Sequence, residues 1–368
     1  MPRRKTVRDT LRFPYQLLLL FLAALLLWAP GILTGQSSAS LTPGPKPADI
    51  PQAWKPWIGE YGWPPENGTP GQVFIVGEKD GSISIWQRDS KPEDANYKSI
   101  DNFLSSVSPT GPTHRYLYLK PSGERVFSLG DVEWRKMTPD AGATQQIFIK
   151  PVKPIRELRE QALGDSPPKE AGPFRKPELV ELTSLDPAIH LDIRYATTND
   201  FLGTPVYTQA RAFLQRPAAE ALVRALHKLQ PLGYGLLIHD AYRPWYVTKI
   251  FWDATPPEGK IFVADPAQGS RHNRGCAADL TLYDLATGKP IEMPGTYDEM
   301  SPRSFPDYPG GTSLQRWHRD LLRRAMESEG FTVYEHEWWH FDYKDWHEYP
   351  ILNIKFEDLH SGQGLAAQ

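Results

Sequence analysis

Two short stretches of the sequence carry residues that could hold a metal ion and move protons. In the first, His272 precedes Asp279 by seven residues, with a glycine turn between them. In the second, Glu337 precedes His340 by three residues. His272, Asp279 and His340 would give a metal three protein ligands and one open position, which is typical of a catalytic rather than a structural zinc site. Glu337 would then remain as the base that a metal-activated water needs.

A third polar cluster, Asp240-Ala-Tyr-Arg-Pro244, follows the apolar run 235–239. Arg243 offers a fixed cation for the oxyanion that forms when water adds to a carbonyl. Each cluster alone is a weak signal. Arg243 could equally cap a helix or form a salt bridge. His272 and Asp279 could likewise be a turn histidine and a surface aspartate. All three clusters nevertheless lie at the ends of apolar runs in one part of the chain, where active sites are commonly built.

The elements that must position these clusters mix strands and helices from about residue 174 onward. Apolar or alternating runs predict strands over 190–195, 235–239, 276–283 and 331–336. Helical spacing predicts helices over 217–229, after Pro244, and from Thr312 or Ser313 toward Gly330. Positions 337 and 340 would face opposite sides of a regular strand, so we expect the chain to bend between them.

Residues 57–150 are predicted to form a small all-β domain. Short runs of β-branched and aromatic residues recur at 72–76, 82–86, 115–119, 125–129 and 145–149. Asp80 and Gly81 separate the first two runs and predict a hairpin. These runs favour an antiparallel sheet or barrel of about six strands. The only histidine of this region, His114, indicates no chemistry, so we interpret the domain as a docking or binding module.

Three segments flank these domains. Residues 41–56 are rich in proline and predict an extended linker. Residues 151–173 combine a short helix over 155–163 with a second proline-rich linker, and residues 361–368 form a C-terminal tail. The chemistry is therefore expected within residues 174–360.

The N-terminal 40 residues are typical of an export signal. Basic residues come first, followed by an unbroken apolar run over 17–29 and then by small residues near Ser37 and Ala39. The apolar run is shorter than the ~20 residues that a membrane span usually needs. We therefore predict a signal peptide or N-terminal anchor over 1–40 and a periplasmic or secreted protein. Residues 17–29 would hold it at the membrane only if the signal is not cleaved.

Composition excludes some partners and cross-links. The 368 residues are 40% hydrophobic and 23% charged, which is ordinary for a globular protein. The net charge of -3 gives no reason to expect a nucleic-acid partner. The single cysteine, Cys276, makes an intramolecular disulfide impossible.

Four motifs in order resemble the zinc D-alanyl-D-alanine dipeptidases of the vancomycin-resistance type. The first two are Asp192-Ile-Arg-Tyr-Ala-Thr-Thr-Asn-Asp-Phe201 and His239-Asp-Ala-Tyr-Arg-Pro244. The others are Ser270-Arg-His-Asn-Arg-Gly-Cys-Ala-Ala-Asp-Leu-Thr-Leu282 and Glu337-Trp-Trp-His-Phe341. A further element of the family resembles Gly295-Thr-Tyr-Asp298. The resemblance covers about residues 174–355, half of the chain, and leaves the preceding β domain unexplained.

The resemblance implies an α+β fold: a small zinc-peptidase domain with a central antiparallel sheet and flanking helices, preceded by the small all-β domain. It implies one Zn²⁺ on His272, Asp279 and His340. Glu337 would act as catalytic base and then acid, and Arg243 would stabilise the transition state. Ser270 would contact the substrate, and Asp298 would bind its amine.

Two residues depart from the family pattern: Cys276 replaces the small residue usual at its position, and His336 is an extra imidazole beside the site. Either could be a rival ligand, and we interpret both as packing or outer residues. The resemblance implies a hydrolase of D-alanyl-D-alanine or a closely related dipeptide, in cell-wall peptide metabolism. One alternative is a D,D- or L,D-carboxypeptidase that acts on peptidoglycan stem peptides. Another is a non-catalytic, zinc-bearing binding protein.

Overall fold

The computed structural model describes residues 41–62, 73–88, 97–99, 117–129, 132–138 and 148–359. Residues 41–368 belong to one compact unit. The predicted signal over 1–40 and most of the predicted strand over 145–149 lie outside the described residues. Within the described ranges, no helix is long and apolar enough to cross a membrane.

The N-terminal part contains a seven-stranded antiparallel sheet with the order β4-β3-β2-β1-β7-β6-β5. Its strands are β1 (Gly59–Gly62), β2 (Val73–Lys79), β3 (Ser82–Arg88), β4 (Tyr97–Ser99), β5 (Leu117–Leu119), β6 (Arg125–Leu129) and β7 (Val132–Lys136). The predicted hairpin between β2 and β3 is confirmed. Asp80 and Gly81 turn the chain with φ of 53° and 78°, as this tight turn requires. Phe74, Phe127 and Trp134 pack together in the core of this sheet.

The C-terminal part is built on a five-stranded sheet with the order β13-β14-β12-β11-β9. Its strands are β9 (Ile189–Leu191), β11 (Tyr234–Asp240), β12 (Ala277–Asp284), β13 (Phe331–Tyr334) and β14 (Glu337–Tyr343). All pairs are antiparallel except the edge pair β9–β11. Two shorter strands, β8 (Leu179–Glu181) and β10 (Phe213–Gln215), form a separate ribbon. The two sheets and the helices are consistent with the predicted α+β class.

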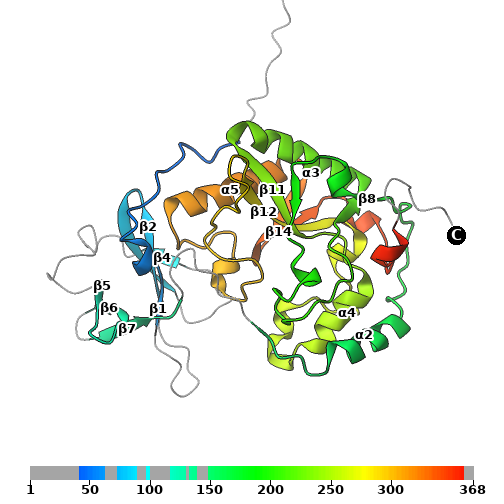
Figure 1. Ribbon diagram of the computed structural model, residues 1–368, viewed down its shortest axis with the longest axis horizontal. Coiled ribbons are helices and arrows are strands. Elements are labelled where there is room, and N and C mark those ends of the chain that lie inside the picture. Colours follow the sequence, from blue (N-terminus) through cyan, green and yellow to red (C-terminus); the bar gives the residue numbers. More distant parts are fainter. Residues whose placement is uncertain are drawn as a thin grey trace, which may run out of the picture. The chain divides into compact units, whose positions relative to one another are not determined.

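The described residues include four α-helices, namely α2 (Ile155–Gly164), α3 (Arg216–Leu229), α4 (Trp245–Ala254) and α5 (Ser313–Glu327). Helix α3 packs against α5 and β11, and α5 contacts β12, β13 and β14 (Figure 1). Helix α2 packs against α4. The predicted cap of α5 is confirmed, because the Thr312 hydroxyl accepts a hydrogen bond from the Gln315 backbone while the Gln315 side chain accepts one from the Thr312 backbone.

Two strand predictions were wrong in detail. Strand β9 ends at Leu191, and a 3₁₀ turn over Arg194–Ala196 follows it, although Ile193 and Tyr195 are both buried in the core. Residues 331–336 form a strand and a turn, after which β14 returns antiparallel to β13. The sequence does not reveal β14 because its residues from Trp338 onward are buried on both faces, without polar alternation.

The pairing of β13 with β14 shifts register between Val333 and Tyr334, so that Tyr334 pairs with Glu337. Glu337 therefore lies at an irregular strand start rather than within a regular ladder. This irregularity replaces the expected bend and lets Glu337 and His340 lie on the same side.

Replacing a core leucine of α5 should destabilise the protein without touching the site. Leu322 is fully buried in the core between α5 and the sheet. Leu322→Ala should lower the free energy of unfolding by about 2–5 kcal/mol, because it removes buried methyl groups and leaves a cavity. Chemical denaturation measures this loss. The neighbouring exposed Arg323→Ala should change stability by no more than about 0.5 kcal/mol. Equal effects of the two substitutions would show that α5 is not packed as described.

Candidate metal centre and active site

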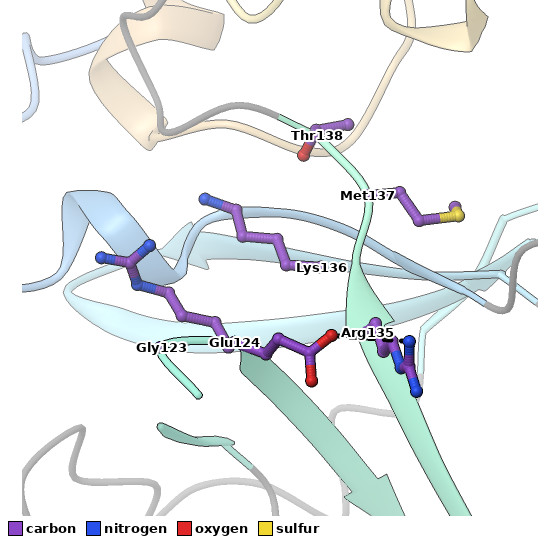
Figure 2. A pocket seen from close by; sticks show the side chains of 7 residues that line it. Gly123, Glu124, Arg135, Lys136, Met137 and Thr138 are labelled. Carbon is purple, nitrogen blue, oxygen red and sulfur yellow. Dashed lines mark ion pairs between the residues drawn. The ribbon is translucent and has the colours of Figure 1, made fainter. Parts of the chain in front are cut away.

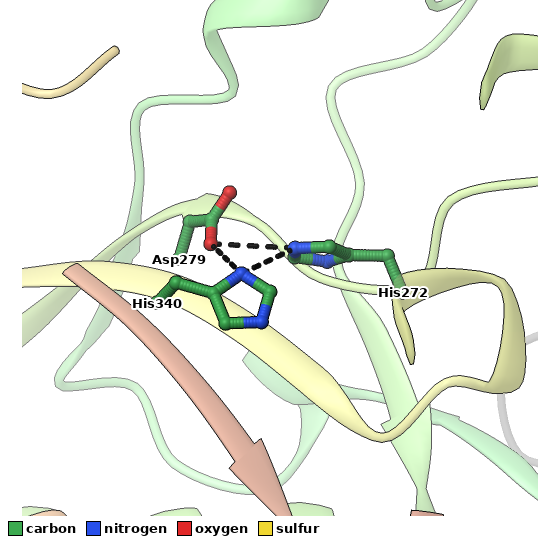
Figure 3. A group of neighbouring side chains, drawn as sticks. All are labelled: His272, Asp279 and His340. Carbon is green, nitrogen blue, oxygen red and sulfur yellow. Dashed lines mark hydrogen bonds and ion pairs between the residues drawn. The ribbon is translucent and has the colours of Figure 1, made fainter. Parts of the chain in front are cut away.

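The three predicted metal ligands converge from separate elements. His272 lies in the 3₁₀ turn Arg271–Arg274, while Asp279 and His340 face each other as paired residues of β12 and β14. The Oδ1 atom of Asp279 lies 3.3 Å from His272 Nε2 and 3.0 Å from His340 Nδ1. The two imidazole nitrogens are 3.1 Å apart (Figure 3). All three side chains are buried.

This triangle of atoms fits a tetrahedral zinc site. Zinc bonds of about 2.0–2.1 Å to nitrogen and oxygen require ligand atoms about 3.3 Å apart, close to the observed spacings. The Oδ1 atom of Asp279 is buried and accepts no hydrogen bond, so a cation would satisfy it. Burial acts to raise the pKa of Asp279, but the charge of His272 and polar contacts with both histidines hold it well below its usual range. Asp279 is thus kept ionised, as a metal ligand must be.

Outer contacts set which nitrogen of each histidine points at the metal site. His272 Nδ1 lies 2.7 Å from the carbonyl oxygen of Ala241, so this nitrogen carries the proton and Nε2 keeps its lone pair. His340 Nε2 lies 2.9 Å from Asp342 Oδ1, which leaves Nδ1 to bind. Arg271 forms an ion pair with the other oxygen of Asp342 at 3.3 Å.

The hydroxyl of Tyr297 donates to the second carboxylate oxygen of Asp279 at 3.2 Å. Each of the three ligands therefore has an outer partner that fixes its orientation. Burial lowers the pKa of His340, but Asp279 and Asp342 outweigh that effect and raise it to about 10. Metal binding must therefore displace a proton from this site.

Glu337 faces the same group from the start of β14. Its Oε2 atom lies 3.7 Å from His340 Nδ1, and its side chain keeps 31% of its surface exposed. Burial raises the pKa of Glu337, and the nearby charge of Asp279 adds to this effect while His340 opposes it. A carboxylate with a raised pKa beside a metal site suits a group that must both accept and release a proton.

Arg243 is held rigidly at the end of β11. Its Nε and Nη2 atoms donate to Asp240 Oδ2 at 2.9 and 2.8 Å, and Tyr207 donates to the other oxygen of Asp240 at 2.6 Å. The guanidinium also lies over the rings of Tyr195 and Phe251. Arg243 does not cap α4, whose first residues have no side-chain cap. The salt bridge of the structural alternative thus exists, but it is made to Asp240 and holds the cation in place.

Asp298 has a strained, left-handed backbone, and one of its carboxylate oxygens is buried. It is a non-glycine residue with φ of 56°, a conformation that usually persists only where the surroundings enforce it. Tyr195 donates to its Oδ1 atom at 3.2 Å, whereas Oδ2 is buried without a hydrogen bond. Burial and the charges of Asp279 and Glu337 raise its pKa well above the usual range. The arrangement leaves one carboxylate oxygen for a donor or cation from outside the protein.

The remaining predicted residues lie around this group. The hydroxyl of Ser270 caps the turn that carries His272, accepting from the His272 backbone at 3.3 Å. Cys276 lies in the apolar core, where burial raises the pKa of its thiol, and it is not part of the metal-ligand group. His336 is exposed and contacts the Tyr334 hydroxyl at 3.3 Å. Among the described residues, the group of side chains that could hold a metal is His272, Asp279 and His340.

Four supporting residues were not singled out from the sequence: Tyr195, Asp240, Tyr297 and Asp342. Tyr195 and Asp240 lie inside quoted motifs, and Tyr297 precedes Asp298, so proximity was an available signal. The sequence signal for Asp342 was weaker, because only the position of β14 shows that the Asp342 side chain reaches His340.

A separate pocket of about 420 Å³ lies on the seven-stranded sheet and is lined by Gly123, Glu124, Arg125, Arg135, Lys136, Met137 and Thr138 (Figure 2). Arg135 forms an ion pair with Glu124 at 3.5 Å, and Lys136 Nζ donates to the carbonyl oxygen of Pro56 at 2.7 Å. Its lining combines three basic side chains with the single carboxylate of Glu124.

The part of the chain that carries these residues is similar in sequence to known peptidases. The sequence model of the D-Ala-D-Ala dipeptidase family, Peptidase_M15, matches residues 175–360. A D-alanyl-D-alanine dipeptidase from Escherichia coli is 36% identical over 179 residues, covering 49% of this chain and 91% of that protein. The dipeptidase from Enterococcus faecalis is 36% identical over 193 residues, covering 47% of this chain and 95% of that protein. The chain therefore belongs to the D-Ala-D-Ala dipeptidase family of peptidases.

Proposed function

We propose that this protein is a zinc peptidase that hydrolyses D-alanyl-D-alanine. The observation that carries the proposal is the triangle of ligand atoms on His272, Asp279 and His340, with Glu337 facing it. Membership of the dipeptidase family supports the reaction and the substrate class. When bound, zinc would supply Lewis-acid chemistry that polarises the scissile carbonyl and lowers the pKa of water.

Glu337 and Arg243 divide the remaining work of peptide hydrolysis. Glu337 takes a proton from the attacking water and passes one to the leaving amine, for which its raised pKa is suited. Arg243 presents a positive charge to the oxyanion that exists only after attack. Because Asp240 and Tyr207 already fix its guanidinium, little reorganisation is needed when that charge develops.

The position of Asp298 favours a free dipeptide over a longer peptide. A D-Ala-D-Ala dipeptide carries an ammonium group close to the bond that is cut, whereas the same residues at the end of a stem peptide do not. The unsatisfied Oδ2 of Asp298 would accept this ammonium group, beside the negative charges of Asp279 and Glu337. Ser270, at the edge of the ligand turn, would contact the substrate as well.

The two alternative functions, a carboxypeptidase and a non-catalytic binding protein, explain fewer of these observations. A carboxypeptidase acting on stem peptides would have no amine to place against Asp298. A binding protein that only holds zinc would need neither Glu337 nor a preorganised Arg243.

We further propose export to the periplasm or beyond and a role in cell-wall peptide metabolism, with residues 1–40 as signal or anchor.

Zinc affinity should depend on the ligands and on Asp342. His272→Ala, Asp279→Ala and His340→Ala should each abolish tight zinc binding, because a three-ligand site cannot lose one ligand. Asp342→Ala should weaken zinc binding about 10–100-fold, because His340 then loses its orienting carboxylate. Competition with a chelator measures these affinities. Asp345→Ala, which removes a nearby carboxylate that pairs with Arg175, should leave zinc affinity unchanged. Unchanged zinc affinity in Asp342→Ala would refute the orienting role.

Glu337 and Arg243 should differ from the ligands in their phenotype. Glu337→Gln should keep zinc and lose about 10²–10⁴-fold in kcat, because proton transfer is removed. Arg243→Ala should also keep zinc, with a loss of about 10²–10³-fold that falls on kcat rather than KM, as for a donor to the transition state. Kinetics, metal analysis and a thermal melt on the same samples separate these effects. A destabilised but fully active Arg243→Ala would assign that residue a structural role only.

Substrate comparison tests the recognition of the amine. The wild-type protein should cleave free D-Ala-D-Ala much faster than the N-acetylated dipeptide or a stem peptide that ends in D-Ala-D-Ala. Asp298→Asn should raise KM for the free dipeptide by about tenfold or more, since a charged hydrogen bond contributes about 1.5–3 kcal/mol. The same substitution should barely change the poor cleavage of the acetylated substrate. Preferential cleavage of the stem peptide would favour the carboxypeptidase instead.

A further inference from the structure

The seven-stranded sheet has no role in the reaction described above, yet its strand β2 contacts the segment that carries Asp298. This segment, residues 294–311, will be called the substrate segment. It begins after the bridge between Tyr283 and Pro290, passes Tyr297 and Asp298, and ends at the cap of α5.

The far end of the substrate segment is joined to β2 by backbone pairing. Gly77 and Gly311 form a parallel bridge, and the Glu78 backbone donates to the carbonyl oxygen of Gly311 at 2.9 Å. A Cβ atom on Gly77 would lie only 2.9 Å from that same oxygen and 2.7 Å from the Trp86 ring. Gly311 has φ of 75°, which favours glycine. Both positions are thus suited to this close approach.

The side chain of Glu78 strengthens the junction. Although charged, Glu78 is only 3% exposed. Its carboxylate accepts from the Ser313 backbone at 2.7 Å, from the Ser313 hydroxyl at 3.2 Å and from the Gly81 backbone at 2.7 Å. Ser313 is the first residue of α5, where a negative charge is stabilised by free backbone donors and by the helix dipole.

Arg316 binds both partners at once. Its Nη1 atom donates to the carbonyl oxygens of Pro309, Gly310 and Gly311 at 3.0, 3.1 and 3.2 Å. Its Nη2 atom donates to the carbonyl oxygen of Glu78 at 2.6 Å. The guanidinium therefore links the end of the substrate segment to β2.

A small apolar cluster completes the contact. Ile75 and Trp86 of the sheet pack with Tyr308 of the substrate segment, and all three are buried. The Tyr308 carbonyl oxygen also accepts from Arg319 of α5 at 2.8 Å.

The near end of the substrate segment reaches the metal site. Tyr297 donates to Asp279 and stacks on His239 with ring centres 4.5 Å apart. Inside the segment, the Nε atom of Arg303 lies 3.2 Å from the Pro294 carbonyl oxygen and 3.3 Å from Glu299. At the far end, a Cβ atom on Gly311 would lie 3.4 Å from Pro294, so the two ends are close together. The far end, which is joined to β2, therefore lies against the near end, which reaches the metal ligand Asp279 through Tyr297.

We propose that the seven-stranded sheet positions the substrate segment, through Glu78 and Arg316, and so holds Asp298 in place for the substrate amine. The strained φ of Asp298 and the placement of its buried Oδ2 atom near the charges of Asp279 and Glu337 are unfavourable, so surrounding contacts must enforce them. Glu78 and Arg316 are positioning residues that touch neither metal ligands nor substrate. The inference rests on the proposed role of Asp298.

The test uses the full-length, zinc-loaded protein and measures KM, kcat and amide hydrogen exchange. Arg316→Ala should raise KM for D-Ala-D-Ala on the order of tenfold, the scale of coupling between residues of one network, while zinc content stays the same. Exchange in residues 294–311 should rise, and exchange in β11 and β12 should not. Arg323→Ala, which removes an exposed arginine of the same helix, should change neither quantity. Arg316→Lys and Glu78→Gln are milder substitutions that should give smaller changes of the same kind, should Arg316→Ala fold poorly.

The double variant Arg316→Ala/Asp298→Asn separates the two ideas. If the sheet acts through Asp298, Arg316→Ala should add little to the KM of Asp298→Asn. A normal KM in Asp298→Asn itself would refute the amine contact, and exchange in 294–311 would still report whether the sheet holds the segment. A folded Arg316→Ala, or its milder substitutes, with normal KM and normal exchange in 294–311 would overturn the positioning role.

Discussion

The structure depends on bringing three carboxyl groups, Asp279, Asp298 and Glu337, into one largely buried site. Burial, together with the repulsion between these like charges, raises the pKa of Asp298 and Glu337. Cations relieve this repulsion. Arg243 is one such cation, and the proposed function adds a metal on the ligand triangle and the substrate amine near Asp298. The need to offset these negative charges therefore links metal binding, substrate choice and catalysis.

The polar groups of the site come from two kinds of backbone, namely regular paired strands and irregular turns or strand ends. Paired strands set Asp279 against His340, because register in a buried antiparallel pair is strongly specified. The side chains that must approach from other directions come from turns and strand ends. Glu337 comes from a register shift, His272 from a capped 3₁₀ turn, and Asp298 from a left-handed position. Each irregularity aims one functional group at the same centre.

The seven-stranded sheet is connected to this site through the substrate segment. The family match begins at residue 175 and does not include this sheet. The sheet is therefore not part of the sequence that defines the peptidase family. At the contact with the end of the substrate segment, the sheet nevertheless supplies the buried charge of Glu78 and the close backbone of Gly77, and Arg316 of α5 links Glu78 to the segment. An added module can thus act on a reaction through the loop that it supports.

The sequence by itself determined the metal-ligand candidates, the helices α3 and α5, and the strands β11 and β12. These follow from residue chemistry and from local periodicity, which short windows of sequence contain. The family resemblance added Asp298, whose strain and unsatisfied oxygen no local pattern announces. Only the tertiary structure decided that β14 is a separate strand, that Asp342 orients His340, and that Glu78 lies against α5. Those facts depend on register and on contacts between residues far apart in the chain, and a local pattern carries no information about either.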